Sequence, residues 1–158
     1  MTWFEQKITS TATVEATRDA VWEALTDPDL LAKLTPFLKQ ITADGDTWVW
    51  TMSSVSILGK DLAPTFTEAM SFTEKTRIGF THAPPEGEKE WAGVEGVYTL
   101  GDAGEGTTDL GIELGVSVDL PFPKATGPAV RKALEGVLAG MGRKFSANLL
   151  DHLGAREA

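Results

Sequence analysis

The sequence of 158 residues contains no cysteine and only two histidines. Without cysteine the chain can form no disulfide, use no thiolate nucleophile and build no zinc site on thiolate ligands. His152 falls in the last turn of a predicted C-terminal helix, where a cation is favourable. His82 alone cannot hold a metal ion, and the sequence has no spaced cluster of metal ligands, no serine nucleophile motif and no phosphate-binding glycine loop. We therefore predict no metal site and no cofactor.

Positive charge is also scarce, because 14 Lys and Arg stand against 23 Asp and Glu, for a formal net charge of −9. No basic cluster is present, so a nucleic-acid partner is not expected. The same sign of charge disfavours anionic membrane surfaces. The sequence also lacks a run of about eighteen apolar residues and a basic-then-apolar signal segment at its start. We expect a cytoplasmic protein without membrane insertion.

The first part of the sequence predicts one strand followed by two short helices. Residues 4–16 alternate apolar or small with polar side chains, which is typical of a strand. The apolar residues of the next segment recur at helical spacing behind Thr17, a good N-cap. Asp27 and Pro28 end this helix and begin another, with Asp27 as cap and Pro28 in the first turn. Pro36 ends the second helix.

The rest of the sequence predicts a run of strands and then one long helix. Residues 38–120 are strand-like almost throughout, with Gly, Asp and Pro at the turns. Apolar residues then recur every three or four positions in residues 127–154, as in an amphipathic helix. Strands followed by a helix indicate an α+β fold, and no linker or repeat divides residues 1–158, so we predict a single domain. One helix about 10 Å wide cannot fill the hollow of a long, curved sheet, which favours an apolar cavity between them.

Two segments resemble a known superfamily. "ATRDAVWEALTDPDLLAKLTP", residues 16–36, resembles the early helix pair of the START-like, helix-grip group, also called SRPBCC. Residues 118–153 are similar to the last strand, proline-rich link and closing helix of that group, and the resemblance covers essentially the whole chain. It implies a helix-grip fold, with a strongly curved antiparallel sheet of about seven strands and a long C-terminal helix over its concave face. The group includes lipid and hormone carriers and polyketide cyclases, so the resemblance implies a ligand cavity without naming the ligand.

We predict that ligand contacts come from one face of the sheet and the apolar face of the last helix. Trp48 and Trp50 share a strand face, where they either wall the cavity or simply fill the interior. No residue is assigned a catalytic role. The predicted ligand-binding residues are Trp48, Trp50, Phe66, Glu68, Met70, Phe72, Phe80, His82, Tyr98, Leu114, Val116, Val137, Met141 and Phe145.

Three of these residues are polar, and each has two interpretations. Strict alternation turns Glu68 inward with Phe66 and Met70, where a carboxyl with a raised pKa could act as an acid, a base or a polar anchor. A bulge or rim position would instead let Glu68 reach solvent. His82 lies either at the mouth of the cavity or on a rim, bonded to backbone or water. Tyr98 either orients a ligand carbonyl or phenol, or is a core tyrosine.

These observations favour a protein, monomeric or homodimeric, that binds an apolar molecule of aromatic, polyketide-like or lipid-like type. One alternative is a cyclase or dehydratase that uses the same cavity, with Glu68, His82 or Tyr98 moving a proton. Another is a ligand-free module that binds a protein partner. A polar cluster in the cavity would favour the enzyme, an apolar cavity the carrier, and a collapsed cavity the partner-binding module.

The last helix contains three glycines, although each costs roughly 1 kcal/mol relative to alanine in a helix interior. A helical projection places Gly136 and Gly140 in a stripe of small residues, and Gly142 at the edge of the apolar face. The stripe could admit another backbone, from this chain or a second subunit. Alternatively, a weak helix could bend to admit a ligand, or its apolar face could simply absorb the cost.

Overall fold

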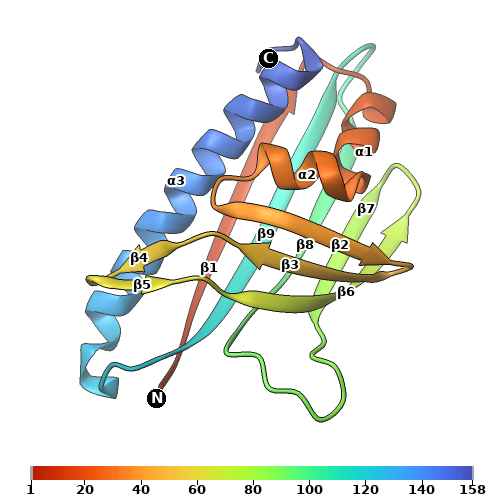
Figure 1. The fold of residues 1–158 in the computed structure, drawn as a ribbon. Helices are drawn as coiled ribbons and strands as arrows, with labels where there is room; N and C mark the ends of the chain where they lie inside the picture. Colours follow the sequence, from red (N-terminus) through yellow and green to blue (C-terminus); the bar gives the residue numbers. More distant parts are fainter. Residues whose placement is uncertain (1, 158) are drawn as a thin grey trace.

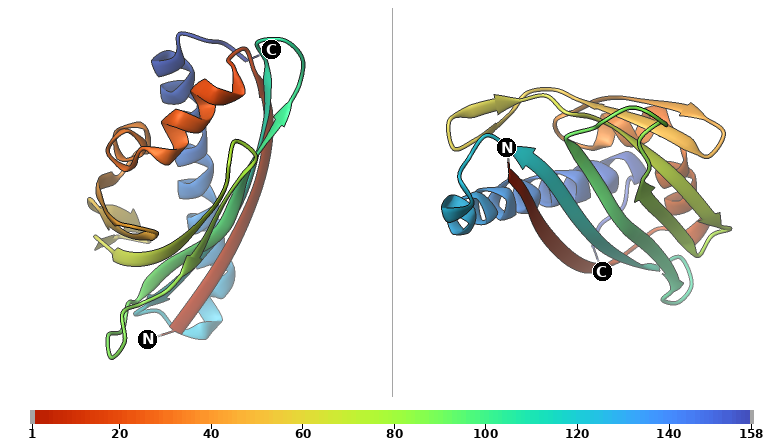
Figure 2. Two further views of the ribbon diagram at one scale, coloured as in Figure 1. Left: turned by 90° about the vertical axis from the view of Figure 1, so that its right-hand side faces the viewer. Right: turned by 90° about the horizontal axis from the view of Figure 1, so that it is seen from below.

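The computed structural model describes residues 2–157 and contains a seven-stranded antiparallel sheet that curls around a long helix (Figures 1 and 2). The sheet combines strands from both halves of the chain. The strands, in their order across the sheet, are β1 (Thr2–Val14), β9 (Thr108–Leu120), β8 (Ala92–Asp102), β7 (Arg77–His82), β6 (Thr65–Thr73), β3 (Thr47–Met52) and β2 (Leu38–Asp44).

Two short helices, α1 (Arg18–Thr26) and α2 (Pro28–Leu34), follow the first strand as predicted. The Thr17 hydroxyl accepts a hydrogen bond from the backbone N–H of Ala20 at 3.2 Å. The Asp27 carboxylate accepts from the N–H groups of Asp29 and Leu30, and Pro28 occupies the first turn. These caps satisfy N–H groups that have no partner inside a helix, which is why the chain breaks between the two helices.

The long helix α3 (Gly127–Leu153) lies in the hollow of the sheet, as Figure 2 shows. A short 3₁₀ turn, η1 (Lys124–Thr126), connects it to β9. Gly154 ends α3 in the left-handed conformation, with φ of 61°, which glycine adopts at low cost. The predicted α+β helix-grip architecture is thus confirmed.

Neighbouring strands of the sheet differ in how far along their length they pair. β1 and β9 pair continuously from Thr2 with Leu120 to Val14 with Thr108. β7 and β8, in contrast, pair only from Arg77 with Thr99 to Phe80 with Gly96. Beyond that point the two strands separate and leave a gap in the wall of the sheet.

A separate hairpin of β4 (Val55–Ile57) and β5 (Lys60–Leu62) leaves the sheet between β3 and β6 and contacts α3 (Figure 1). Its turn residues, Leu58 and Gly59, both have positive φ, of 49° and 81°. Two such residues make the turn that matches the twist of a tight hairpin. The sequence pattern indicated strands here but did not separate this hairpin from the main sheet.

The helix glycines face open space. A Cβ atom at Gly136 or Gly142 would meet no atom within 4 Å, and one at Gly140 would meet only the Arg143 guanidinium at 3.8 Å. No backbone within residues 2–157 therefore approaches the stripe, so the prediction that it admits another part of this fold is wrong.

The double variant Gly136→Ala, Gly140→Ala is expected to be more stable by about 2 kcal/mol, because two alanines gain helix propensity without a clash. For a chain of this length the melting temperature should rise by roughly 4–8 °C. Chemical denaturation followed by tryptophan fluorescence measures the change. Gly154→Ala is the control, because the same substitution at positive φ should lower stability. A double variant less stable than wild type would show that another chain packs against the stripe.

Within residues 2–157, no helix has the length and apolar character needed to cross a membrane. The same part of the chain contains no group of three or more His, Cys, Asp or Glu placed to hold a metal ion.

Candidate ligand cavity

A cavity of about 160 Å³ lies between the concave face of the sheet and α3. Its walls are almost entirely apolar and come from the sheet, the β4–β5 hairpin and the helix. The sequence predicted a cavity in this place because one helix cannot fill the hollow of the sheet. The predicted residues that line it are Trp50, Phe66, Phe80, Tyr98, Leu114, Val116, Val137 and Met141.

Sequence reasoning missed the part of the wall that the hairpin and the loop before β8 supply. Val55, Ile57 and Leu62 come from the hairpin, and Trp91 comes from the loop. The alternation of Val55 and Ile57 before Leu58-Gly59 is a hairpin signal that could have separated these strands from the sheet. Trp91 carries no such signal, since only the path of its loop brings it to the cavity.

The structure does not bring Trp48, Met70 or Phe72 to the cavity. They lie on the same strand faces as Trp50 and Phe66, but further along, where α1 and α2 cover the sheet. The Phe72 ring packs edge-on against Trp22 of α1, with centroids 6.3 Å apart, and Trp48 packs against Phe72 at 5.8 Å. Phe72 is also 37% exposed. The prediction placed these three residues in the cavity with Trp50 and Phe66, but the concave face is longer than the cavity, and Trp22 of α1 packs against Phe72 at its other end.

Phe145 is buried in the core but does not line the cavity either. The side-chain amide of Asn148 donates a hydrogen bond to the backbone carbonyl of Leu34 at 3.0 Å, which ties α3 to α2. Beyond Met141, Phe145 and Leu149 of α3 are buried in the packed core and do not line the cavity. The cavity is therefore covered only by the part of α3 from Leu134 to Met141.

Aromatic rings form a continuous group along one wall of the cavity. Trp50 stacks on Phe66 with an angle of 19° and centroids 6.0 Å apart. Phe80 lies between Trp50, at 6.4 Å, and Tyr98, at 5.5 Å. Such flat, adjoining surfaces suit a planar apolar ligand.

Two side chains of this wall carry a polar atom without a hydrogen-bond partner among the described residues. The indole Nε1 of Trp50 is enclosed by protein atoms and has no hydrogen-bond partner in the described structure. The Tyr98 hydroxyl makes no hydrogen bond to residues 2–157 either, and burial raises the pKa of Tyr98 to about 12. Tyr98 therefore remains a neutral O–H donor at physiological pH.

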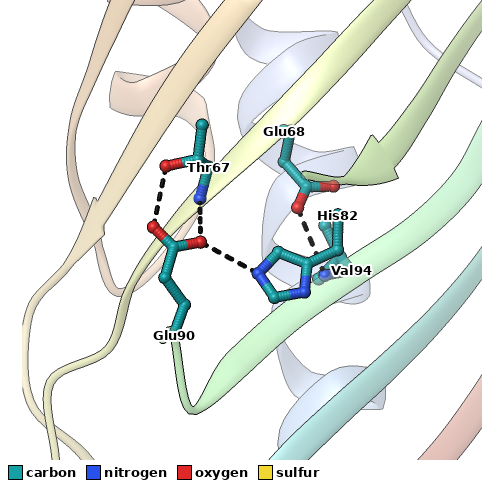
Figure 3. Close-up of polar contacts among 5 residues, drawn as sticks. All are labelled: Thr67, Glu68, His82, Glu90 and Val94. Atoms are coloured by element: carbon teal, nitrogen blue, oxygen red, sulfur yellow. Dashed lines mark hydrogen bonds and ion pairs between the residues drawn. The ribbon is translucent and has the colours of Figure 1, made fainter. Parts of the chain in front are cut away.

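Glu68 is completely buried but lies outside the cavity, so the alternative of a solvent-exposed rim position is wrong. It stands opposite His82 in the β6–β7 register. One carboxyl oxygen, Oε2, accepts a long hydrogen bond of 3.5 Å from the backbone N–H of Val94, and Oε1 has no hydrogen-bond partner among residues 2–157 (Figure 3). Burial raises its pKa to about 8, assisted by the charges of Glu95 and Glu90, against the lowering effect of the Val94 hydrogen bond.

A second carboxylate, Glu90, lies beside this position and binds Thr67 at two points (Figure 3). Its Oε1 accepts the Thr67 backbone N–H at 2.7 Å, and its Oε2 accepts the Thr67 hydroxyl at 2.7 Å. Its Oε1 also lies 2.9 Å from Nε2 of His82. Burial alone would raise the Glu90 pKa, but the hydrogen bonds from Thr67 and His82 and the charge of His82 lower it overall.

His82 is fixed between Glu90 and the backbone of β8. A Cβ atom at Gly93 would overlap the imidazole ring and lie 2.6 Å from its Cδ2. Only glycine allows this close approach. His82 is thus largely buried, with 18% of its side chain exposed, and it does not line the cavity.

These polar residues lie where β7 and β8 separate, beyond the pair of Phe80 with Gly96. The Thr67 carbonyl accepts a hydrogen bond from the backbone N–H of Ala83, which follows β7. The Thr67 N–H, in contrast, donates to the carboxylate of Glu90. On the β8 side of the gap, the backbone N–H of Val94 donates a hydrogen bond to the Glu68 carboxyl group. Because unpaired buried N–H groups are costly, the two carboxylates act as substitutes for missing strand partners. Sequence reasoning identified Glu68 and His82 but missed Glu90, which lies in a polar loop without a periodic pattern.

Comparison with known proteins agrees with this architecture. Residues 5–153 match the model of a family described as polyketide cyclase / dehydrase and lipid transport. No curated protein matches the chain at a significant level.

Solved structures resemble the chain over nearly its whole length. The Zhui aromatase/cyclase from a Streptomyces species is 17% identical, with a TM-score of 0.69 over 95% of this chain and 94% of that one. A conserved protein from Geobacillus kaustophilus is 16% identical, with a TM-score of 0.71 over 94% and 95%. A START superfamily protein from Mycobacterium smegmatis is 18% identical, with a TM-score of 0.66 over 94% and 97%. At these identities the likeness supports the fold alone.

Proposed function

Because the chain belongs to the polyketide cyclase / dehydrase and lipid transport family, we propose that it binds a small apolar molecule in the cavity between the sheet and α3. The observation that carries this proposal is the cavity itself, which is enclosed by apolar side chains from three parts of the fold. Moving an apolar ligand from water into such surroundings is favourable, at about 25 cal/mol for each Å² of apolar surface buried.

The size of the cavity limits the ligand. An apolar cavity of about 150 Å³ engineered into another protein stays dry and binds benzene. The cavity here has about 160 Å³ of free space and a wall of adjoining aromatic rings. These dimensions support a planar ligand of one or two rings.

Binding has more support than catalysis. A cyclase or dehydratase needs a group that takes up and releases a proton at the substrate. Tyr98 is the one titratable residue among the described residues that line the cavity, and its pKa of about 12 keeps it protonated. Glu68 and His82, the other candidates, lie outside the lining. The free space within the cavity likewise supports a ligand-binding role over a ligand-free, partner-binding one.

Filling the cavity tests the proposal. Val137 lines the cavity and Ala139 lies exposed on the same helix, so Val137→Phe adds a ring inside while Ala139→Phe adds one outside. Wild type and Ala139→Phe are expected to bind toluene and naphthalene with equal affinity. Val137→Phe should bind them at least about ten-fold more weakly, because the ring takes up the ligand's space.

Ligand-detected NMR titration measures these affinities, and circular dichroism checks that each variant is folded. If wild type bound neither hydrocarbon, or if both helix variants bound them equally, the cavity would not be the ligand site.

A further inference from the structure

We propose that the ligand carries a neutral carbonyl group on an aromatic ring, and that this carbonyl accepts a hydrogen bond from the Tyr98 hydroxyl. The inference rests on the proposed function and names the class of molecule that this cavity takes: aromatic ketones, aldehydes or quinones, in preference to hydrocarbons of the same shape.

The position of Tyr98 is well defined by the sheet. It lies in β8 between Ile78 of β7 and Ile112 of β9, in the part of the sheet where both neighbours still pair. Its ring packs against Phe80, with centroids 5.5 Å apart and an angle of 47°. The phenol is therefore held by packing, and its hydroxyl is a fixed polar point on the cavity wall.

This hydroxyl has no structural partner. Tyr98 is only partly buried and lines the cavity, so its hydroxyl is not fully enclosed by protein atoms, and a phenylalanine would occupy the same place without a polar atom in an apolar lining. Since Tyr98 makes no hydrogen bond within residues 2–157, packing alone does not explain why a hydroxyl stands there. An acceptor brought by a ligand would satisfy it.

The rest of the lining defines what kind of acceptor fits. The Thr35 hydroxyl already donates to the Leu31 carbonyl at 2.8 Å, which leaves its oxygen only as an acceptor, and Nε1 of Trp50 is enclosed by protein atoms and out of a ligand's reach. The Tyr98 hydroxyl, which makes no hydrogen bond within residues 2–157, is thus a lining donor that a ligand acceptor can satisfy. No lysine, arginine or histidine is among its described lining residues, so a carboxylate would lose its hydration without gaining a counter-charge. A neutral acceptor on a planar ring matches both the Tyr98 hydroxyl and the aromatic wall.

The test compares two ligands of the same shape on two proteins. Acetophenone and α-methylstyrene differ only in having C=O or C=CH₂ beside the ring. Tyr98→Phe differs from wild type only in the hydroxyl. Wild type should prefer acetophenone, and Tyr98→Phe should bind acetophenone about five-fold more weakly, the effect of one ordinary hydrogen bond. The affinity of α-methylstyrene should stay within about two-fold, and this also shows that the variant keeps its cavity.

Each other outcome has a definite meaning. An equal loss for both ligands would show that Tyr98 only supports the cavity, and no loss for either would show that the hydroxyl meets no ligand; both results overturn the inference. If wild type bound toluene or naphthalene but not acetophenone, the inference would fail while the proposed function stood. If none of the four probes bound, the proposed function itself would fail.

Discussion

Replacing Glu68 with glutamine is expected to remove most of the fall in stability that the wild-type protein shows between pH 5 and pH 9. The Glu68 carboxyl is fully buried, and its pKa is raised from 4.5 to about 8. The unfolded chain therefore releases this proton as the pH rises above 4.5, whereas the native protein keeps it until about pH 8. Over this interval the free energy of unfolding should fall by about 1.4 kcal/mol per pH unit, or about 5 kcal/mol in all.

The sign follows from which state holds the proton. Below pH 4.5 both states are protonated and Glu68 has no pH-dependent effect. Above about pH 8 both are ionised, and the native state retains a buried charge that is poorly compensated, because among residues 2–157 only Val94 donates a hydrogen bond to it. Glutamine is neutral throughout, so Glu68→Gln should lie within about 1 kcal/mol of wild type at pH 5 and be several kcal/mol more stable at pH 9.

Urea unfolding at pH 5, 7 and 9, followed by tryptophan fluorescence, measures this effect. Glu113→Gln is the matched control, because it removes one negative charge from an exposed position of the same sheet. The control should keep the wild-type slope of stability against pH. Parallel pH profiles for wild type and Glu68→Gln would contradict a raised pKa at Glu68.

The second large effect is expected at Gly96, where Gly96→Ala should destabilise the protein by about 3 kcal/mol or more, since the sheet backbone would have to move. A Cβ atom at Gly96 would overlap the backbone carbonyl oxygen of Glu113 and lie 3.0 Å from the Phe80 ring. Gly96 stands at the last paired position of β7 and β8, so the shift would also disturb Phe80 in the cavity wall. A fall in melting temperature of roughly 6–12 °C should result.

Gly101 in the same strand provides the control. A Cβ atom there would lie 3.7 Å from Asp109 Cβ, an ordinary contact, so Gly101→Ala should change stability by less than about 0.5 kcal/mol. Differential scanning calorimetry of both variants makes the comparison. Equal melting temperatures for the two would show that β8 can move away from β9 at Gly96 without cost.

The helices were the most predictable elements because their signals are local. Thr17 marks where α1 begins and Asp27 marks where α2 begins, through hydrogen bonds to residues two or three positions away, and Pro28 occupies the first turn of α2. The apolar periodicity before Gly154 likewise fixes α3 without reference to the sheet. The β4–β5 hairpin was harder to distinguish from the main sheet, since its alternation of apolar and polar residues continues that of the strands on either side.

The sequence by itself determined the fold class, the order of the elements and the existence of a space between the sheet and α3. These follow from periodicity, capping and the width of one helix. Only the tertiary structure decided which inward residues meet that space. Trp50 lines the cavity while Trp48 packs against Phe72, and Glu68 accepts a hydrogen bond from Val94 where β7 and β8 separate. Alternation assigns a residue to a face, but what covers that face depends on contacts between segments far apart in the chain.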